Sequence, residues 1–200
     1  MKRSSTLKKA VVLLLATGVI FTASCSAKQT SGTNDMTAQP DGRDYTFTIP
    51  ADWSVLRDDS MYAIESPSIT VDNHNKTSNI SVLSAVIHDK AEEYVNISED
   101  ELLSAYVPKY MDMVKAEFGA TEYDGNVEDI EISGKPGKKV AYSYTDPFTE
   151  ETFFFETAFA LLKTNNYCYC YYLTYTANGT EAFDEFRGGF NKVIASFDFN

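Results

Sequence analysis

The sequence contains few of the residues from which metal sites and nucleophilic sites are usually built. Its 200 residues include only 2 histidines, His74 and His88, and 3 cysteines, Cys25, Cys168 and Cys170. A structural zinc site needs four ligands. A Cys₂His₂ set can therefore be counted, but the histidines lack any ligand spacing that would support it. The GxSxG, HExxH, phosphate-loop and EF-hand motifs are absent as well. We therefore expect no catalytic set, no metal and no cofactor.

Positive charge is also scarce. The chain has 17 lysine and arginine residues against 29 aspartate and glutamate residues, a formal net charge of −12. The first basic residues cluster at the amino terminus, whereas the first acidic residue is Asp35, so the rest of the chain is more acidic than the total suggests. An acidic surface repels phosphate backbones and anionic lipid head groups. We expect no nucleic-acid partner.

Long hydrophobic runs are limited to one, AVVLLLATGVIF at residues 10–21, which follows the basic segment MKRSSTLKK. A membrane-spanning helix needs about 20 apolar residues, so this shorter run is typical of a signal peptide. Small residues, Ala23 and Ser24, directly precede Cys25. This arrangement resembles a bacterial lipoprotein signal, in which Cys25 would receive a diacylglyceryl thioether and become the first mature residue. Thr22 departs from the pattern, because leucine is usual there.

Two acyl chains are enough for stable membrane anchoring. The alternative is an ordinary secretory signal with a chance cysteine. The polar composition after Cys25 favours the lipoprotein, because an anchored domain needs a tether. We therefore expect a signal peptide at residues 1–24, a flexible polar tether at 25–43 and a single folded domain at 44–200. The domain would be extracytoplasmic and lipid-anchored to the bacterial cell membrane, which could be the outer membrane in a Gram-negative cell.

Hydrophobic periodicity predicts an α+β domain. Apolar alternation and turn residues indicate strands at 45–49, 61–66, 80–87, 126–133, 139–145, 152–164 and 167–177, with polar turns at 74–79 and 134–139. Ser98 and Glu101 form a capping box that begins a helix ending at Gly119, which Pro108 should kink or break. A second amphipathic helix covers 180–199, with Thr180 as its N-cap. The order of elements predicts a mainly antiparallel sheet with helices packed on it.

The stretch YCYCYY at residues 167–172 invites a redox or metal interpretation. Residues i and i+2 of a strand lie about 6.6–7 Å apart, whereas a disulfide needs Cβ atoms about 3.5–4.5 Å apart. Cys168 and Cys170 therefore cannot bridge in a regular strand. We expect both thiols to be buried on one face beside Tyr172, with the odd-numbered tyrosines on the other. The many aromatic residues nearby predict either a filled core or a part-exposed groove for a sugar, peptide or hydrophobic ligand.

Several short motifs together resemble the PsbP/Mog/DcrB-like superfamily. Ile49, Pro50 and Trp53 form its opening Ile-Pro-x-x-Trp turn, and Ser196 and Phe197 form its Ser-Phe ending. The resemblance covers about residues 44–200 and implies an α/β/α sandwich. Members of the superfamily include photosystem extrinsic subunits, proteins that bind the GTPase Ran, and bacterial envelope lipoproteins. No shared catalytic residues exist to be carried over.

These features predict a non-catalytic binding or assembly module of the cell envelope, anchored through lipid on Cys25. Its partner would be an envelope protein or a small ligand. The alternative is a surface hydrolase or a metal-dependent enzyme that uses His74 or His88. A histidine within hydrogen-bond reach of a carboxylate or of the two thiols would favour that alternative.

Overall fold

The computed structural model describes residues 35–38, 44–58, 61–71, 74–118, 121–123 and 125–200. Its elements in chain order are β1 (Met36–Ala38), β2 (Tyr45–Ile49), β3 (Ser54–Asp58), β4 (Met61–Glu65), β5 (Ile69–Val71), β6 (His74–Lys76), β7 (Ser78–His88), the 3₁₀ turn η1 (Ala91–Glu93), α2 (Glu99–Phe118), β8 (Thr121–Glu122), β9 (Glu128–Ile132), β10 (Lys135–Thr145), β11 (Thr152–Lys163), β12 (Cys168–Asn178), α3 (Thr180–Ser196) and β13 (Asp198–Phe199). The expected fold class, a mainly antiparallel sheet with helices packed on it, is confirmed.

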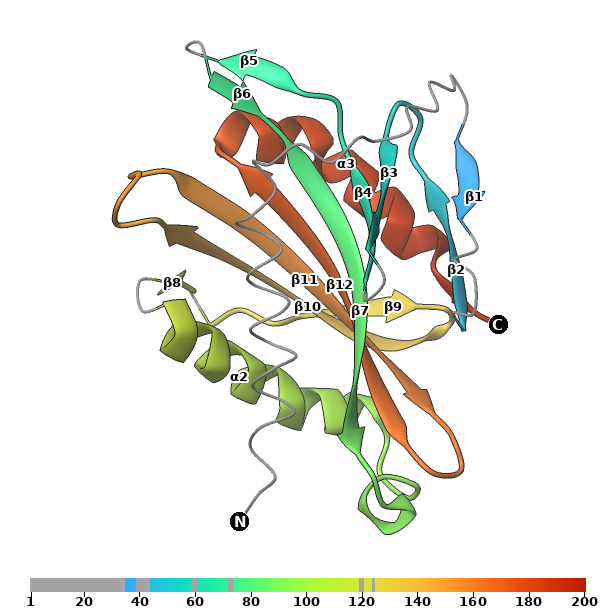
Figure 1. Cartoon of the computed structure of the whole chain (residues 1–200). Coiled ribbons are helices and arrows are strands. Elements are labelled where there is room, and N and C mark those ends of the chain that lie inside the picture. Colours follow the sequence, from blue (N-terminus) through green and yellow to red (C-terminus); the bar gives the residue numbers. More distant parts are fainter. Residues whose placement is uncertain (1–34, 39–43, 59–60, 72–73, 119–120, 124) are drawn as a thin grey trace.

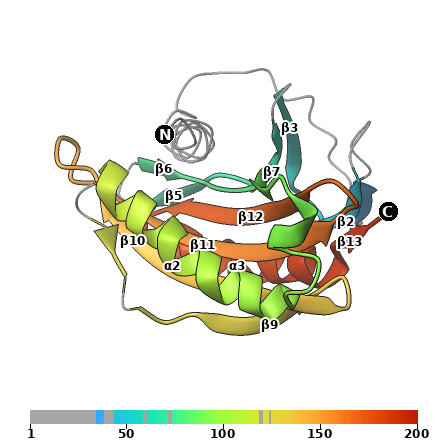
Figure 2. The ribbon, with the colours of Figure 1, turned by 90° about the horizontal axis from the view of Figure 1, so that it is seen from below.

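Among the described residues, eight strands form the main sheet. Its order is β3-β4-β7-β12-β11-β10-β8, and β9 pairs with β10 beside β8. Neighbouring strands are antiparallel throughout. The long central strands run diagonally through the molecule, with α2 and α3 on either side of them (Figure 1). Seen from below, α2 passes over β10 and β11 (Figure 2).

Strand β12 separates two hydrophobic clusters by the alternation of its side chains. Cys168, Cys170 and Tyr172 join the cluster that includes the buried face of α2. Tyr171, Leu173, Tyr175 and Ala177 join the cluster that includes α3 and β2. The two helices therefore cover opposite faces of the sheet, and the predicted division of cysteines and tyrosines between the faces is confirmed.

Helix α2 begins as its sequence predicts. The Glu101 backbone N–H donates to Ser98 Oγ at 3.2 Å, which is half of the expected capping box. The break expected at Pro108 is not found, because α2 continues across it. Pro108 and Ser104 lie on the exposed side of the helix. The Ser104 carbonyl that loses its helical partner therefore faces water, which satisfies it.

Helix α3 begins one residue earlier than predicted. Gly179 rather than Thr180 is the N-cap, with φ at 86°, a conformation that glycine adopts at little cost. The helix ends at Ser196, and residues 198–199 form β13 instead of continuing it. Phe190, Val193 and Phe197 line its buried face as expected.

The Ile-Pro-x-x-Trp turn and α3 are packed directly against each other. Trp53 is buried, and its ring lies edge-on to Phe186 with centroids 6.2 Å apart. A Cβ built on Gly189 would lie 2.8 Å from the Trp53 ring and 3.3 Å from Pro50 Cγ. Gly189 therefore makes room for the tryptophan, which explains why a helix-weakening residue occurs in the middle of α3.

Three predicted boundaries are wrong. Residues 36–38, assigned to the tether, form β1 and pair with β2. Residues 74–76, assigned to a turn, form β6 and pair with β5. Residues 135–139, also assigned to a turn, open β10 and pair with β9. None of these segments has an extended alternating apolar pattern, but strand pairing uses backbone groups that every residue except proline has in full.

Candidate functional site

The structure describes the side chains of only some of the sequence-predicted chemical residues, and among these His88 and Cys168 lie opposite each other on β7 and β12. Cys25 lies outside the described residues. His74 begins β6, and its side chain is likewise outside the described part of the structure. His88 ends β7, and its Nδ1 lies 3.3 Å from Glu93 Oε2, with both side chains about one-third exposed. In the described ranges no group of three or more histidine, cysteine, aspartate or glutamate side chains is placed to hold a metal ion.

Cys168 and Cys170 are free thiols and are fully buried. Burial raises the pKa of the Cys168 thiol to about 11, and it raises the pKa of the Cys170 thiol well above its usual value. Reactive cysteines need the opposite shift, because the thiolate is the nucleophile and the metal ligand. The two thiols are therefore part of the core beneath α2, as the sequence pattern predicts.

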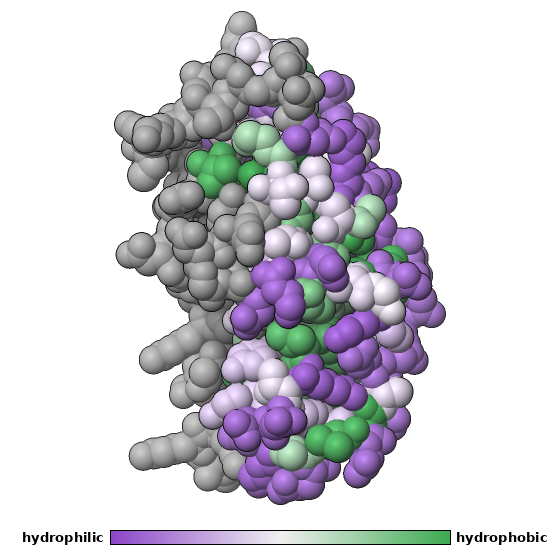
Figure 3. All heavy atoms as spheres, turned by 90° about the vertical axis from the view of Figure 1, so that its right-hand side faces the viewer, coloured by the Kyte–Doolittle hydropathy of each residue, from purple (hydrophilic) through white to green (hydrophobic). Residues whose placement is uncertain are grey.

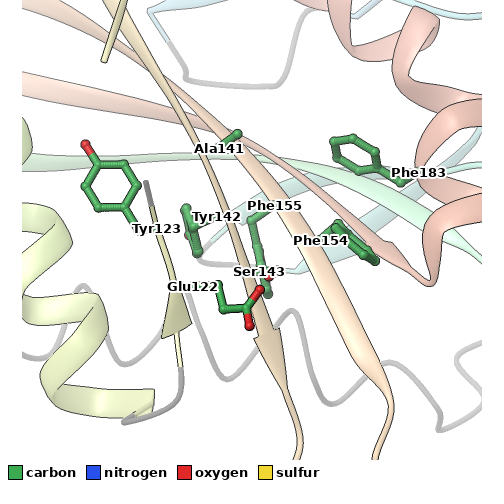
Figure 4. A pocket seen from close by; sticks show the side chains of 8 residues that line it. All are labelled: Glu122, Tyr123, Ala141, Tyr142, Ser143, Phe154, Phe155 and Phe183. Carbon is green, nitrogen blue, oxygen red and sulfur yellow. The ribbon is translucent and has the colours of Figure 1, made fainter. Parts of the chain in front are cut away.

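A solvent-open hollow of about 660 Å³ lies at the β10 edge of the main sheet. Its lining comes from four parts of the chain: Glu122 and Tyr123 in and after β8, Ala141, Tyr142 and Ser143 in β10, Phe154 and Phe155 in β11, and Phe183 in α3. Tyr123 stands at one side of this hollow and Phe183 at the other, with Phe154 and Ser143 between them (Figure 4). We call this feature the aromatic hollow.

The pairing of β10 with its two short neighbours determines where the aromatic hollow lies. Strand β9 pairs with Lys135–Lys139, and β8 pairs with Ser143 and Tyr144. The hollow lies between these two short strands, over Ala141 and Tyr142. On the α3 side it is bounded by Phe154 and Phe183, whose ring centroids are 5.5 Å apart.

Charged groups lie at both ends of the aromatic hollow. Glu156, which is 1 % exposed, shares its sheet face with Phe154 and is paired with Arg187, whose Nε lies 3.0 Å from Glu156 Oε2. The Arg187 guanidinium also lies over the Phe183 ring, 5.7 Å from its centroid. At the other end, Lys115 Nζ lies 5.1 Å from the Tyr123 ring centroid. Both cations are thus held against lining aromatics.

The lining of the aromatic hollow suits contact with a planar or apolar group. Burial raises the pKa of the Tyr142 hydroxyl, so this lining tyrosine stays neutral at physiological pH. Most of the remaining lining is aromatic or aliphatic carbon with a few polar groups, the usual composition of a ligand site. Such a surface binds planar or apolar groups through area burial and ring contacts.

The sequence indicated only part of the aromatic hollow. The sequence predicted an excess of aromatic side chains in the last strands and the final helix without saying which are exposed, and two of them, Phe154 and Phe183, line the hollow. The contribution of β8 was missed, because a strand of two residues has no detectable periodicity. Its position beside β10 is visible only in the pairing.

Comparison with solved structures supports the fold. LpqN of Mycobacterium tuberculosis, a protein involved in cell envelope biogenesis, aligns with a TM-score of 0.53 and 11% sequence identity, over 84% of this chain and 91% of LpqN. The chain shares its fold with LpqN. At this identity the likeness concerns the fold alone.

Two other solved structures align less well. The Ran-binding protein Mog1p of Saccharomyces cerevisiae has a TM-score of 0.46 and 9% identity over 84% of this chain and 96% of its own. A protein of unknown function from Pseudomonas aeruginosa, PA94, has a TM-score of 0.44 and 11% identity over 78% and 91%. No protein-family model matches the sequence, and no curated protein matches it significantly. Membership of the PsbP/Mog/DcrB-like superfamily stays a prediction.

One face of the molecule is mostly hydrophilic where its residues are described. On the side shown in Figure 3, the green apolar patches are small and separated by purple polar side chains. A search of the described helices finds none with the length and apolar character needed to cross a bilayer.

Proposed function

We propose that this protein is a lipid-anchored, extracytoplasmic component of the bacterial cell envelope whose domain binds a ligand or partner without catalysing a reaction. The lipoprotein-like signal ending at Cys25 supports the anchor. LpqN shares the fold and is described as involved in cell envelope biogenesis, which supports the same setting. The aromatic hollow carries the binding part of the proposal, because it offers an open, largely apolar concave surface.

Metabolic labelling with an alkyne analogue of palmitate tests the anchor. The wild-type chain should incorporate the label and sediment with membranes, and Cys25→Ala should do neither. Equal labelling of both chains would exclude lipid attachment at Cys25. This result is independent of whether the domain binds anything.

Titration with indole, a planar aromatic probe, tests the aromatic hollow. Saturable shifts of the Ala141 and Ser143 backbone amide resonances are expected in NMR spectra of the wild-type chain. Phe183→Ala should abolish these shifts, because Phe183 forms one side of the hollow. Phe186→Ala is the matched control, since Phe186 lies on the same helix but packs on Trp53. Unchanged shifts in Phe183→Ala would refute the site.

A surface hydrolase or metal-dependent enzyme is the second candidate function. The contact between His88 Nδ1 and Glu93 Oε2 favours it, because a carboxylate can orient a histidine as a general base. Neither residue lines the aromatic hollow. Hydrolysis of p-nitrophenyl acetate that is lost in His88→Gln or His74→Gln would establish this function in place of the first.

A further inference from the structure

The turn between β10 and β11 displays a phenylalanine that the fold does not use. Phe148 is 93 % exposed, the largest exposed fraction among the large hydrophobic side chains of the described residues. An apolar ring that stays in water gains nothing from folding. Its whole apolar area is therefore available for burial against another molecule.

The turn holds Phe148 in place through Asp146. The backbone N–H groups of Phe148 and Thr149 donate to Asp146 Oδ1 at 2.8 and 3.0 Å. The Glu150 N–H donates to the Asp146 carbonyl oxygen at 2.9 Å, and the Asp146 N–H donates to the Glu151 carbonyl oxygen at 2.9 Å. The two bonds to Oδ1 also lower the pKa of the Asp146 carboxyl. A ring presented on a fixed turn loses little entropy when it is bound.

The sequence neighbours of Phe148 carry negative charge. Asp146, Glu150 and Glu151 lie within three residues of it, and no lysine or arginine occurs between Lys139 and Lys163. A second copy of the chain would bring the same acidic turn and a net charge of −12. Anionic lipid surfaces would be repelled as well. Charge complementarity therefore favours a basic protein surface.

We propose that Phe148 is the anchor of a protein-docking surface whose partner has an apolar pocket bordered by lysine or arginine. The ring would fill the pocket, and Glu150 and Glu151 would meet the basic rim. Central aromatic anchors of this kind dominate binding energy, and flanking charges set association rate and specificity. The inference names the partner class of the binding module and rests on that proposed function.

Photo-crosslinking tests this surface in cells that naturally express the full-length chain. p-Benzoylphenylalanine replaces Phe148, and as the control it replaces Tyr167, which is 42 % exposed in the turn at the opposite end of β11. A crosslink to one protein through a segment rich in lysine or arginine, specific to position 148, is expected. Crosslinking to lipid, to a second copy or to an acidic segment, or no crosslink, would overturn the proposal.

Affinity for that crosslinked segment, prepared as a peptide, gives the quantitative test. Phe148→Ser should weaken binding about 30-fold, as expected for an aromatic hot spot. Phe148→Leu should recover part of the lost affinity. Glu150→Gln should reduce the dependence of the affinity on salt concentration. Equal affinity for wild type and Phe148→Ser would refute the anchor. Failure here, with indole binding intact, would overturn the docking surface and leave the proposed function of the aromatic hollow in place.

Discussion

Two adjacent glycines in α3, Gly188 and Gly189, allow the packing of Trp53 to be measured. A Cβ at position 188 would meet no atom within 4 Å, whereas a Cβ at position 189 would lie 2.8 Å from the Trp53 ring. Both sites are helical, so alanine gains the same intrinsic propensity at each, about 1 kcal/mol. The clash is present only at position 189. The two variants, Gly188→Ala and Gly189→Ala, therefore differ by the cost of displacing the tryptophan.

That cost follows from the burial of Trp53. The side chain is 5 % exposed and lies between α3 and Pro50, so it cannot swing into solvent without losing its core contacts. Inserting a methyl group into a packed core costs about 1–3 kcal/mol. Gly188→Ala should raise the free energy of unfolding by up to about 1 kcal/mol. The free energy of unfolding of Gly189→Ala should be about 1–3 kcal/mol lower than that of Gly188→Ala.

Urea denaturation gives both free energies, and Trp53 is a built-in reporter because it is the only tryptophan in the chain. Its emission in the native state should change in Gly189→Ala and stay constant in Gly188→Ala. Equal stabilisation of both variants, with the same Trp53 emission as wild type, would refute the packing argument.

Three further perturbations probe other parts of the fold. Ser98→Ala should lower the free energy of unfolding by about 1 kcal/mol, measured in urea, because it removes the hydroxyl that caps α2. Arg187→Ala should lower the free energy of unfolding by about 2 kcal/mol, because it leaves the buried Glu156 carboxylate without its partner. The loss is smaller than for a fully buried pair, since Arg187 is half exposed. Thermal unfolding measures it. The Cys168 thiol should resist iodoacetamide at pH 8 until urea is added. Its raised pKa stabilises the fold below pH 9, and this contribution should disappear as pH rises from about 9 to 11 in pH-dependent urea melts.

Helices and strands that bury one face could be predicted from the sequence. The apolar stripe of α2 and the alternation along β12 are visible as periodic patterns in the sequence, because apolar residues occur on the buried side of each element. Strands β1, β3, β5 and β13 are short, and pairing holds them through backbone groups that every residue has. Their sequences therefore carried no signal.

The candidate sites were less predictable for a different reason. The aromatic hollow joins Tyr123 to Phe183, and only the pairing of β8 with β10 brings these distant residues to one edge. The exposure of Phe148 could not be predicted, because the exposure of a side chain in a loop cannot be inferred from its sequence neighbours. The role of Gly189 was equally hidden, because it depends on the close approach of Trp53.

The pairing of β1 with β2 also affects how an anchored protein would be oriented. Asp35 accepts a hydrogen bond from the Ala51 N–H at 2.8 Å and pairs with Lys192 near the end of α3. In the proposed lipoprotein only about ten residues then separate Cys25 from the domain, a reach of at most about 36 Å. The start of α3 lies at the other end of the helix, where the Gly179 N–H donates to the Thr152 carbonyl oxygen beside the β10–β11 turn. In the proposed lipoprotein, helix α3 would therefore lie between the anchored end of the domain and the Phe148 turn.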